Sequence, residues 1–148
     1  MKHWHDEVRI EAPVEHVWRF FFDTSHWRDW MPRGEFSDFS GPLDHVGTTY
    51  VESMKLMGFE MKMTSEVVEV VPLRLYREHS DSGPMDTTAR FEPDGEGTRL
   101  IMEMDYEMPG KVPGFIKDLF AKGWGDRQGH KMVQDFKALA EAKVPAHA

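Results

Sequence analysis

The chain of 148 residues contains no cysteine, which removes disulfide bonds, thiolate metal ligands and cysteine nucleophiles from consideration. Basic residues are also scarce, because 18 lysines and arginines stand against 26 aspartates and glutamates and give a formal net charge of −8. Binding to nucleic-acid phosphates depends on clustered basic side chains. We therefore expect no nucleic-acid partner and no attraction to an anionic membrane surface.

Long hydrophobic runs are missing as well. A helix that crosses a membrane needs about 20 consecutive apolar residues, and the sequence has no such stretch. The first residues, Met1 to His5, lack the basic and then apolar pattern of a secretion signal. We expect a cytoplasmic protein without integral membrane association, built as a single domain over residues 1–148.

Familiar catalytic and metal-binding motifs are not found. No serine lies in a Gly-x-Ser-x-Gly context, and no helical histidine pair with glutamate marks a hydrolytic zinc site. His3 and His5 share one face of a predicted strand and could chelate a transition metal with Asp6, but a solvent-facing strand edge explains them without a metal. We expect no metal and no cofactor.

The apolar residues are dominated by large, adaptable side chains, with 11 methionines, ten phenylalanines and five tryptophans. Methionine is unbranched and fills irregular space. This composition fits either an ordinary core that is rich in methionine or a deformable ligand cavity.

The N-terminal third has the pattern of a strand followed by short helices. Apolar residues alternate with polar ones from Lys2 to Glu11, which is typical of a half-buried strand. Pro13 suits the first turn of a helix, and apolar residues then repeat at helical spacing up to Phe22. Trp27 and Trp30 stand three residues apart, so they share a face of a second short helix.

Residues 35–108 change to a period of two, interrupted by turn signals such as Gly41-Pro42 and Asp94-Gly95. The pattern predicts about five or six antiparallel strands in this region. Methionines alternate with polar residues along two of them, at Phe59–Val67 and at Leu100–Met108. The methionines should therefore lie together on the covered face of the sheet.

Residues 115–142 carry two helical stripes of apolar side chains that do not line up. Gly123, Gly125 and Gly129 lie between the stripes, and each glycine costs roughly 1 kcal/mol inside a helix relative to alanine. We predict a kink or break near Gly123 to Gly125. The Gly123-Trp124-Gly125 segment has two open interpretations, a gate at a cavity mouth or close contact between helix and sheet.

Several segments together resemble a known superfamily: Ile10-Glu11-Ala12-Pro13 with Val17-Trp18, then Trp27 and Trp30-Met31-Pro32, the hairpin from Phe91 to Thr98, and the terminal amphipathic helix. The chain resembles the polyketide cyclase/dehydrase and lipid-transport superfamily (SRPBCC), which also contains START domains and pollen-allergen-like proteins. The resemblance implies an α+β helix-grip fold, in which a curved antiparallel sheet of about six to seven strands wraps around a long C-terminal helix, with two short helices after the first strand. It implies an apolar cavity between sheet and helix, and it transfers no catalytic residue.

The leading hypothesis is that the protein binds or carries a small hydrophobic ligand, such as a lipid, a polyketide or an isoprenoid-like compound, as a monomer or a homodimer. The residues expected to line the cavity are Trp30, Tyr50, Met54, Phe59, Met61, Met63, Met102, Met104, Tyr106, Phe115, Leu119 and Trp124.

An enzyme is the alternative, namely a metal-free polyketide aromatase or cyclase with acid and base groups in the cavity. The candidate groups are Glu52, Arg77 and His79, although the phase of the Leu73–Asp81 strand is open and Arg77 and His79 could face solvent. A third hypothesis is a module whose acidic surface docks a basic protein.

Overall fold

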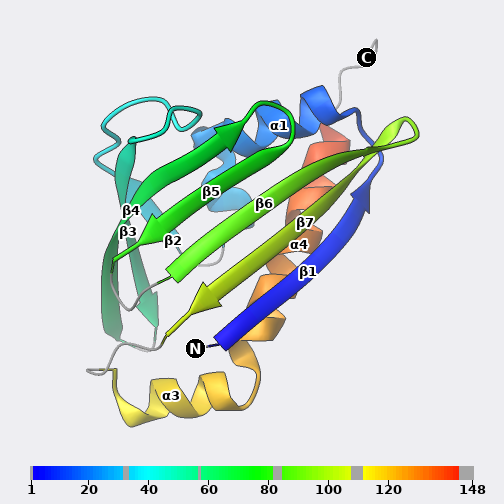
Figure 1. Cartoon of the computed structure of the whole chain (residues 1–148). Coiled ribbons are helices and arrows are strands. Elements are labelled where there is room, and N and C mark those ends of the chain that lie inside the picture. Colours follow the sequence, from blue (N-terminus) through cyan, green and yellow to red (C-terminus); the bar gives the residue numbers. More distant parts are fainter. Residues whose placement is uncertain (1, 32–33, 57, 82–84, 108–111, 144–148) are drawn as a thin grey trace.

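The computed structural model describes residues 2–31, 34–56, 58–81, 85–107 and 112–143 (Figure 1). The elements in chain order are β1 (Lys2–Ile10), α1 (Val14–Phe22), the 3₁₀ helix η1 (Thr24–His26), α2 (Trp27–Trp30), β2 (Gly34–Ser37), β3 (Thr49–Leu56), β4 (Phe59–Val71), β5 (Leu75–Ser80), β6 (Met85–Asp94), β7 (Gly97–Tyr106), α3 (Gly114–Ala121) and α4 (Trp124–Ala142).

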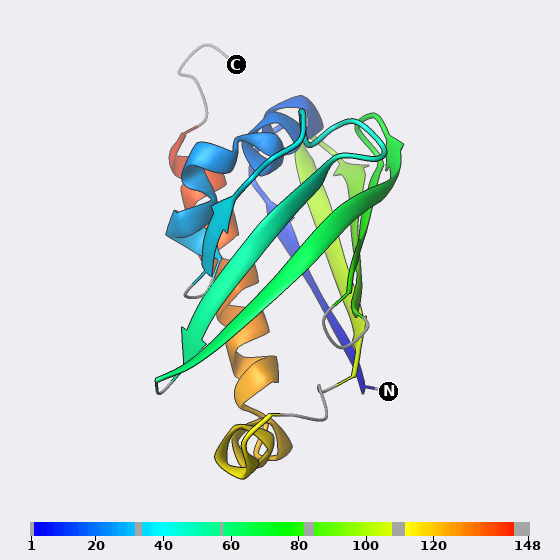
Figure 2. The ribbon, with the colours of Figure 1, turned by 90° about the vertical axis from the view of Figure 1, so that its left-hand side faces the viewer.

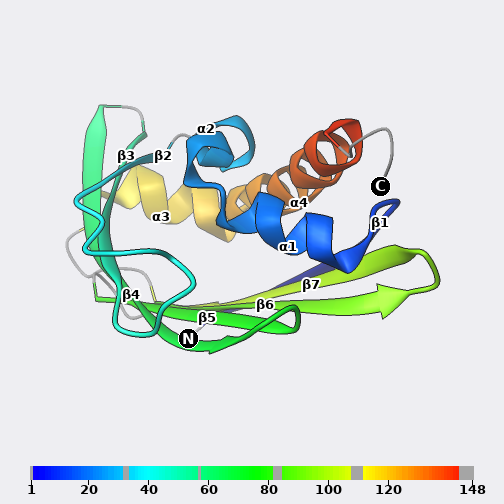
Figure 3. The same cartoon turned by 90° about the horizontal axis from the view of Figure 1, so that it is seen from above.

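The described strands form one seven-stranded antiparallel sheet in the order β1-β7-β6-β5-β4-β3-β2. The first strand of the chain therefore pairs with the last, with Lys2 opposite Tyr106 and Ile10 opposite Thr98. The sheet curves so that β3 and β4 rise beside the helices, and all the helices lie on its concave side (Figures 2 and 3). This arrangement confirms the predicted helix-grip fold.

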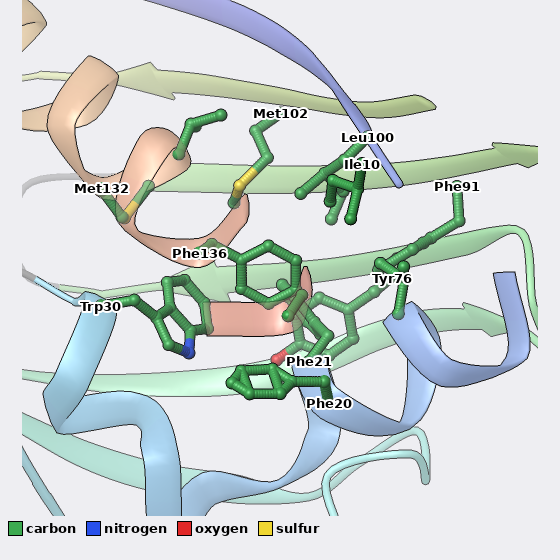
Figure 4. Packing of buried hydrophobic residues seen from close by; sticks show 14 of the residues in the cluster. Ile10, Phe20, Phe21, Trp30, Tyr76, Phe91, Leu100, Met102, Met132 and Phe136 are labelled. Atoms are coloured by element: carbon green, nitrogen blue, oxygen red, sulfur yellow. The ribbon is translucent and has the colours of Figure 1, made fainter. Parts of the chain in front are cut away.

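The main hydrophobic core fills the end of the grip where α1 and the C-terminal half of α4 meet the sheet. Phe21 on α1 lies at its centre, with ring centroids 5.3 Å from Tyr76, 5.4 Å from Phe91 and 6.1 Å from Phe136 (Figure 4). Phe136 also packs against Trp30 at 4.9 Å. Aromatic pairs at such distances add about 0.5–1.5 kcal/mol each beyond their burial.

The C-terminal segment breaks where the glycines predicted it. α3 ends at Ala121 and α4 begins at Trp124, and Gly123 between them has φ of +84°, a conformation that favours glycine. A Cβ at Gly125 would lie 2.9 Å from the Phe120 ring. The close contact at Gly125 is thus with helix α3, whereas the sequence interpretation was a close contact with the sheet, and Gly125 allows α3 and α4 to pack tightly at the break.

A second, smaller hydrophobic cluster lies under α3. Val112 and Ile116 are its buried members, and half-buried Phe59, Leu119, Phe120 and Trp124 pack against them. Its residues are distinct from those of the main core. The hydrophobic interior is therefore divided into a large cluster toward α1 and a small one toward α3.

Helices long and apolar enough to cross a membrane are not found among the described residues.

Candidate functional site

The concave face of β3–β5 changes character along the strands. Toward α1 its side chains are fully buried, as at Val67 and Tyr76. Toward α3 the inward-facing methionines Met54, Met61 and Met63 remain half-buried. Between these zones lies a row of polar side chains, here called the polar band, which consists of Tyr50, Glu52, Ser65, Glu78, Ser80 and Thr87.

Strand pairing places the polar band on one continuous path across four strands. Tyr50 lies opposite Ser65, and Ser65 lies opposite Ser80. Glu78 lies opposite Thr87 on β6, while Glu52 lies opposite Met63. Since side chains on one sheet face recur at every second residue, these pairs all point toward the helices. The band thus separates the packed core from the methionines.

Glu78 is the most deeply buried acid of the band, with 8% of its surface exposed. The Tyr50 hydroxyl donates a hydrogen bond to Glu78 Oε2, and the hydroxyls of Ser65 and Ser80 lie 2.6 Å apart. Glu52, which is half-buried, forms no side-chain hydrogen bond among the residues that the structure describes. Neither carboxyl group has a basic ion-pair partner within that part of the chain.

Two buried donors lie on the inner side, one of them on the same strand as Glu78. The Tyr76 hydroxyl and the Trp30 indole N–H are buried and have no hydrogen-bond partner in the described part of the chain. Tyr76 precedes Glu78 by two residues on the same face of β5. Leaving a buried donor unpaired costs about 1–3 kcal/mol, so such groups are uncommon in a packed core.

Burial sets the protonation of the two acids. It raises the pKa of Glu78 to about 7, although hydrogen bonds from Tyr50 and Ser65 act in the opposite direction. Burial also raises the pKa of Glu52 to about 7, with the charge of Glu78 as a second cause. Interacting acids of this kind lose their protons in two successive steps, whose pKa values belong to the pair and not to either residue. Near neutral pH the band can therefore hold a carboxylic acid and a carboxylate together, which is the requirement for proton transfer in both directions.

The family model for polyketide cyclase/dehydrase and lipid transport proteins matches residues 1–141. The chain belongs to this family. A search of the curated proteins found no match.

Solved structures similar to this family member share the fold at low sequence identity. The Zhui aromatase/cyclase from Streptomyces sp. R1128 is 19% identical, with a TM-score of 0.79 over 99% of this chain and 98% of that one. The protein TTHA0849 from Thermus thermophilus is 20% identical, with a TM-score of 0.75 over 95% and 98% of the two chains. Ara h 8.0201 is 9% identical, with a TM-score of 0.64 over 96% and 99%. At these identities the likeness concerns the fold.

Most of the side chains that the sequence predicted to line a cavity lie on the concave, inner side of the sheet. Tyr50 belongs to the polar band, and the half-buried inner residues are Met54, Phe59, Met61, Met63, Met104, Tyr106, Leu119 and Trp124. Trp30 and Met102, at 2% and 3% exposure, are instead packed into the main core.

Phe115 is a correction to the predicted lining, because 46% of its surface is exposed. The short helix α3 turns Ile116, which is fully buried, toward the interior instead. At about 100° per residue, neighbouring positions on a helix cannot both face inward fully. Phe115 therefore lies at the exposed margin of the predicted stripe, whose other members Ile116, Leu119, Phe120 and Trp124 belong to the cluster under α3.

The structure also shows which residues of β5 face inward and which face solvent. Arg77 and His79 face solvent, where Arg77 lies 3.2 Å from Glu69 and His79 lies 2.8 Å from Asp86. These two residues are thus outside the polar band, and only Glu52 of the three acid–base candidates lies within it. Sequence reasoning missed Glu78 because the alternate face of β5, Tyr76-x-Glu78-x-Ser80, is mostly polar and resembles a solvent-facing one. Tyr76 was the available signal for the buried face.

His3 and His5 likewise point away from the interior. His3 Nδ1 lies 2.6 Å from Asp105, and His5 Nδ1 lies 3.8 Å from Glu103. Asp6 is on the opposite face of β1 and lies 2.9 Å from His130. The three groups considered for a metal site therefore face in two different directions.

Proposed function

We propose that the protein binds a small hydrophobic ligand on the inner surface between the polar band and α3. Half-buried Met54, Met61 and Met63 carry this proposal, because they face the helices and yet belong to neither hydrophobic cluster that the described residues form. Large apolar side chains that face inward are normally packed by neighbours. A ligand that covered them would add contacts that the described residues do not supply.

The free energy expected from covering the methionine side chains supports specific binding of a compound of moderate size. Full burial of one methionine side chain is worth about 1.5–3 kcal/mol. Because the three methionines are already partly covered, the remaining gain is on the order of 3 kcal/mol for all three together. Polar anchors and other apolar contacts, such as Phe59 and Leu119, would add to it.

The first test is organic extraction of the natively purified protein, followed by mass spectrometry for a stoichiometric lipophilic compound. The second is titration with a neutral, environment-sensitive dye such as Nile red. Alanine at both Met54 and Met61 should lower the dye affinity by about tenfold, as expected for about 1.4 kcal/mol of lost contact. Val68→Ala, on the exposed outer face of β4, is the matched control. Unchanged affinity in the double variant would contradict the assignment.

An enzyme of the cyclase or dehydratase type is the second candidate, and the acid pair in the polar band favours it. The carboxylate would take a proton from a carbon next to a carbonyl. The carboxylic acid would give its proton to a departing hydroxyl, which leaves as water while a C=C bond forms. Such general acid–base catalysis typically contributes about 10²–10⁴-fold to a rate.

Turnover of a synthetic β-hydroxyketone, followed as loss of water and formation of the C=C bond, tests this candidate. Glu52→Gln and Glu78→Gln should each lower kcat by about 10²-fold or more, whereas Arg77→Ala and His79→Ala should leave it unchanged. Retained turnover in both glutamine variants would remove the acid pair from the reaction. The cytoplasmic location and the monomeric or homodimeric state stay predictions.

A further inference from the structure

The two acids of the polar band have no counter-charge among the described residues. Glu78 accepts a hydrogen bond from Tyr50, so one of its oxygen atoms has a partner. Glu52 has no side-chain partner in the described part of the chain and is the more exposed of the two. Buried carboxyl groups are usually paired with a cation or with hydrogen-bond donors. Within the described residues, Glu52 is thus an acceptor on the inner face without a side-chain partner, and a ligand could use it.

The position of Glu52 is accessible from the methionine zone. Met54 follows it by two residues on the same face of β3, and Met63 lies directly opposite on β4. A ligand whose body covered Met54, Met61 and Met63 would therefore bring its end close to Glu52. An anionic end would meet the negative charge of the acid pair, whereas a donor would form a hydrogen bond with Glu52.

Aromatic rings surround the same place. Phe36 on β2 lies opposite Glu52 in the strand register. Trp27 packs against both Phe36 and Tyr50, with ring centroids 5.1 and 5.4 Å away. The faces of such rings attract cations. The net charge of −8 further favours the approach of a cation over that of an anion.

We infer that the ligand is an apolar compound with a hydrogen-bond donor at one end, most favourably a protonated amine, which Glu52 binds while the methionines cover the apolar body. This inference rests on the proposed binding function and specifies the chemistry of the ligand. It also implies that compounds ending in a carboxylate, such as free fatty acids, are rejected.

Calorimetric titration with three probes of equal chain length tests the inference: n-octylamine, n-octanol and octanoate. Charge-assisted hydrogen bonds are about twice as strong as neutral ones. Octylamine should therefore bind about tenfold more tightly than octanol, and octanoate should bind most weakly. Glu52→Gln should reduce the ratio of octylamine to octanol affinity to near one, and Glu52→Asp, which keeps the charge, should retain part of it.

Glu66→Gln is the matched control, because it removes the same charge from the exposed outer face of β4. It should leave the affinity ratio unchanged, and the urea midpoint of each variant shows whether it is folded. If octanol binds and octylamine binds no better, or if Glu66→Gln lowers the ratio as much as Glu52→Gln does, the inference is wrong and the binding function stands. If none of the probes binds, the proposed function fails and the inference fails with it.

Discussion

Glu78 should make the protein less stable as the pH rises through neutrality. Its pKa is raised from 4.5 to about 7 in the folded protein, mainly because it is buried. Between these two values the folded state keeps the proton while the unfolded chain loses it. The resulting stabilisation is complete below about pH 4.5 and is lost as the pH rises through about 7.

The size of the effect follows from the pKa difference. One pKa unit corresponds to about 1.4 kcal/mol of free energy. The shift of Glu78 therefore corresponds to at most about 3 kcal/mol of unfolding free energy between pH 4.5 and pH 8. Glu78→Gln removes the titrating proton and keeps an oxygen that can accept from Tyr50. The variant should match the wild type near pH 4.5 and exceed its stability at pH 8.

Urea unfolding at a series of pH values, followed by tryptophan fluorescence and by circular dichroism, measures this difference. Comparing wild type with variant at each pH cancels the contributions of surface groups that both proteins share. Glu66→Gln supplies a control for the loss of one surface charge. A stability difference between wild type and Glu78→Gln that is constant with pH, or one that favours the wild type at pH 8, would refute the assigned burial of Glu78.

Two further predictions concern the buried tyrosines and the contact between α4 and β1. Tyr50→Phe should lower the unfolding free energy by about 1–3 kcal/mol because Glu78 loses its donor. Tyr76→Phe should be neutral or stabilising because the Tyr76 hydroxyl has no partner among the described residues. Equal losses of the two variants in urea unfolding would contradict the hydrogen-bond assignment. A Cβ at Gly129 would lie 2.5 Å from the Trp4 ring, so Gly129→Ala should lower the thermal midpoint at a cost of about 1–3 kcal/mol. Gly114→Ala, with open space around it, is the control, and an equal midpoint for both variants would be inconsistent with this packing.

The fold could be predicted because its signals are local. The alternation from Leu100 to Tyr106, the proline before α1 and the glycines near residue 123 each depend on neighbouring residues, and each has the predicted place in the structure. The site depends on long-range pairing. Tyr50 and Glu78 are 28 residues apart and meet only because β4 lies between their strands.

The alternation of residues along β5 did not predict which face of this strand is buried. A strand that carries polar side chains on its inner face is nearly as polar on that face as on its outer face. Alternation alone therefore cannot show that Glu78 faces inward and Arg77 outward. Only the bonding partners across β4 and β6 determine which face is covered. The misassignment of Phe115 has a related cause, because α3 is short and its orientation is fixed by contacts with Phe59 and Trp124 rather than by its own pattern.

The separation of the small cluster under α3 from the main core has a consequence for local unfolding. Detaching α3 exposes the surface of a cluster with only two fully covered members among the described residues, Val112 and Ile116, and leaves the aromatic packing around Phe21 intact. The free energy of such a sub-global opening is a fraction of that of complete unfolding. The cluster under α3 can therefore open many times for every occasion on which the whole domain unfolds.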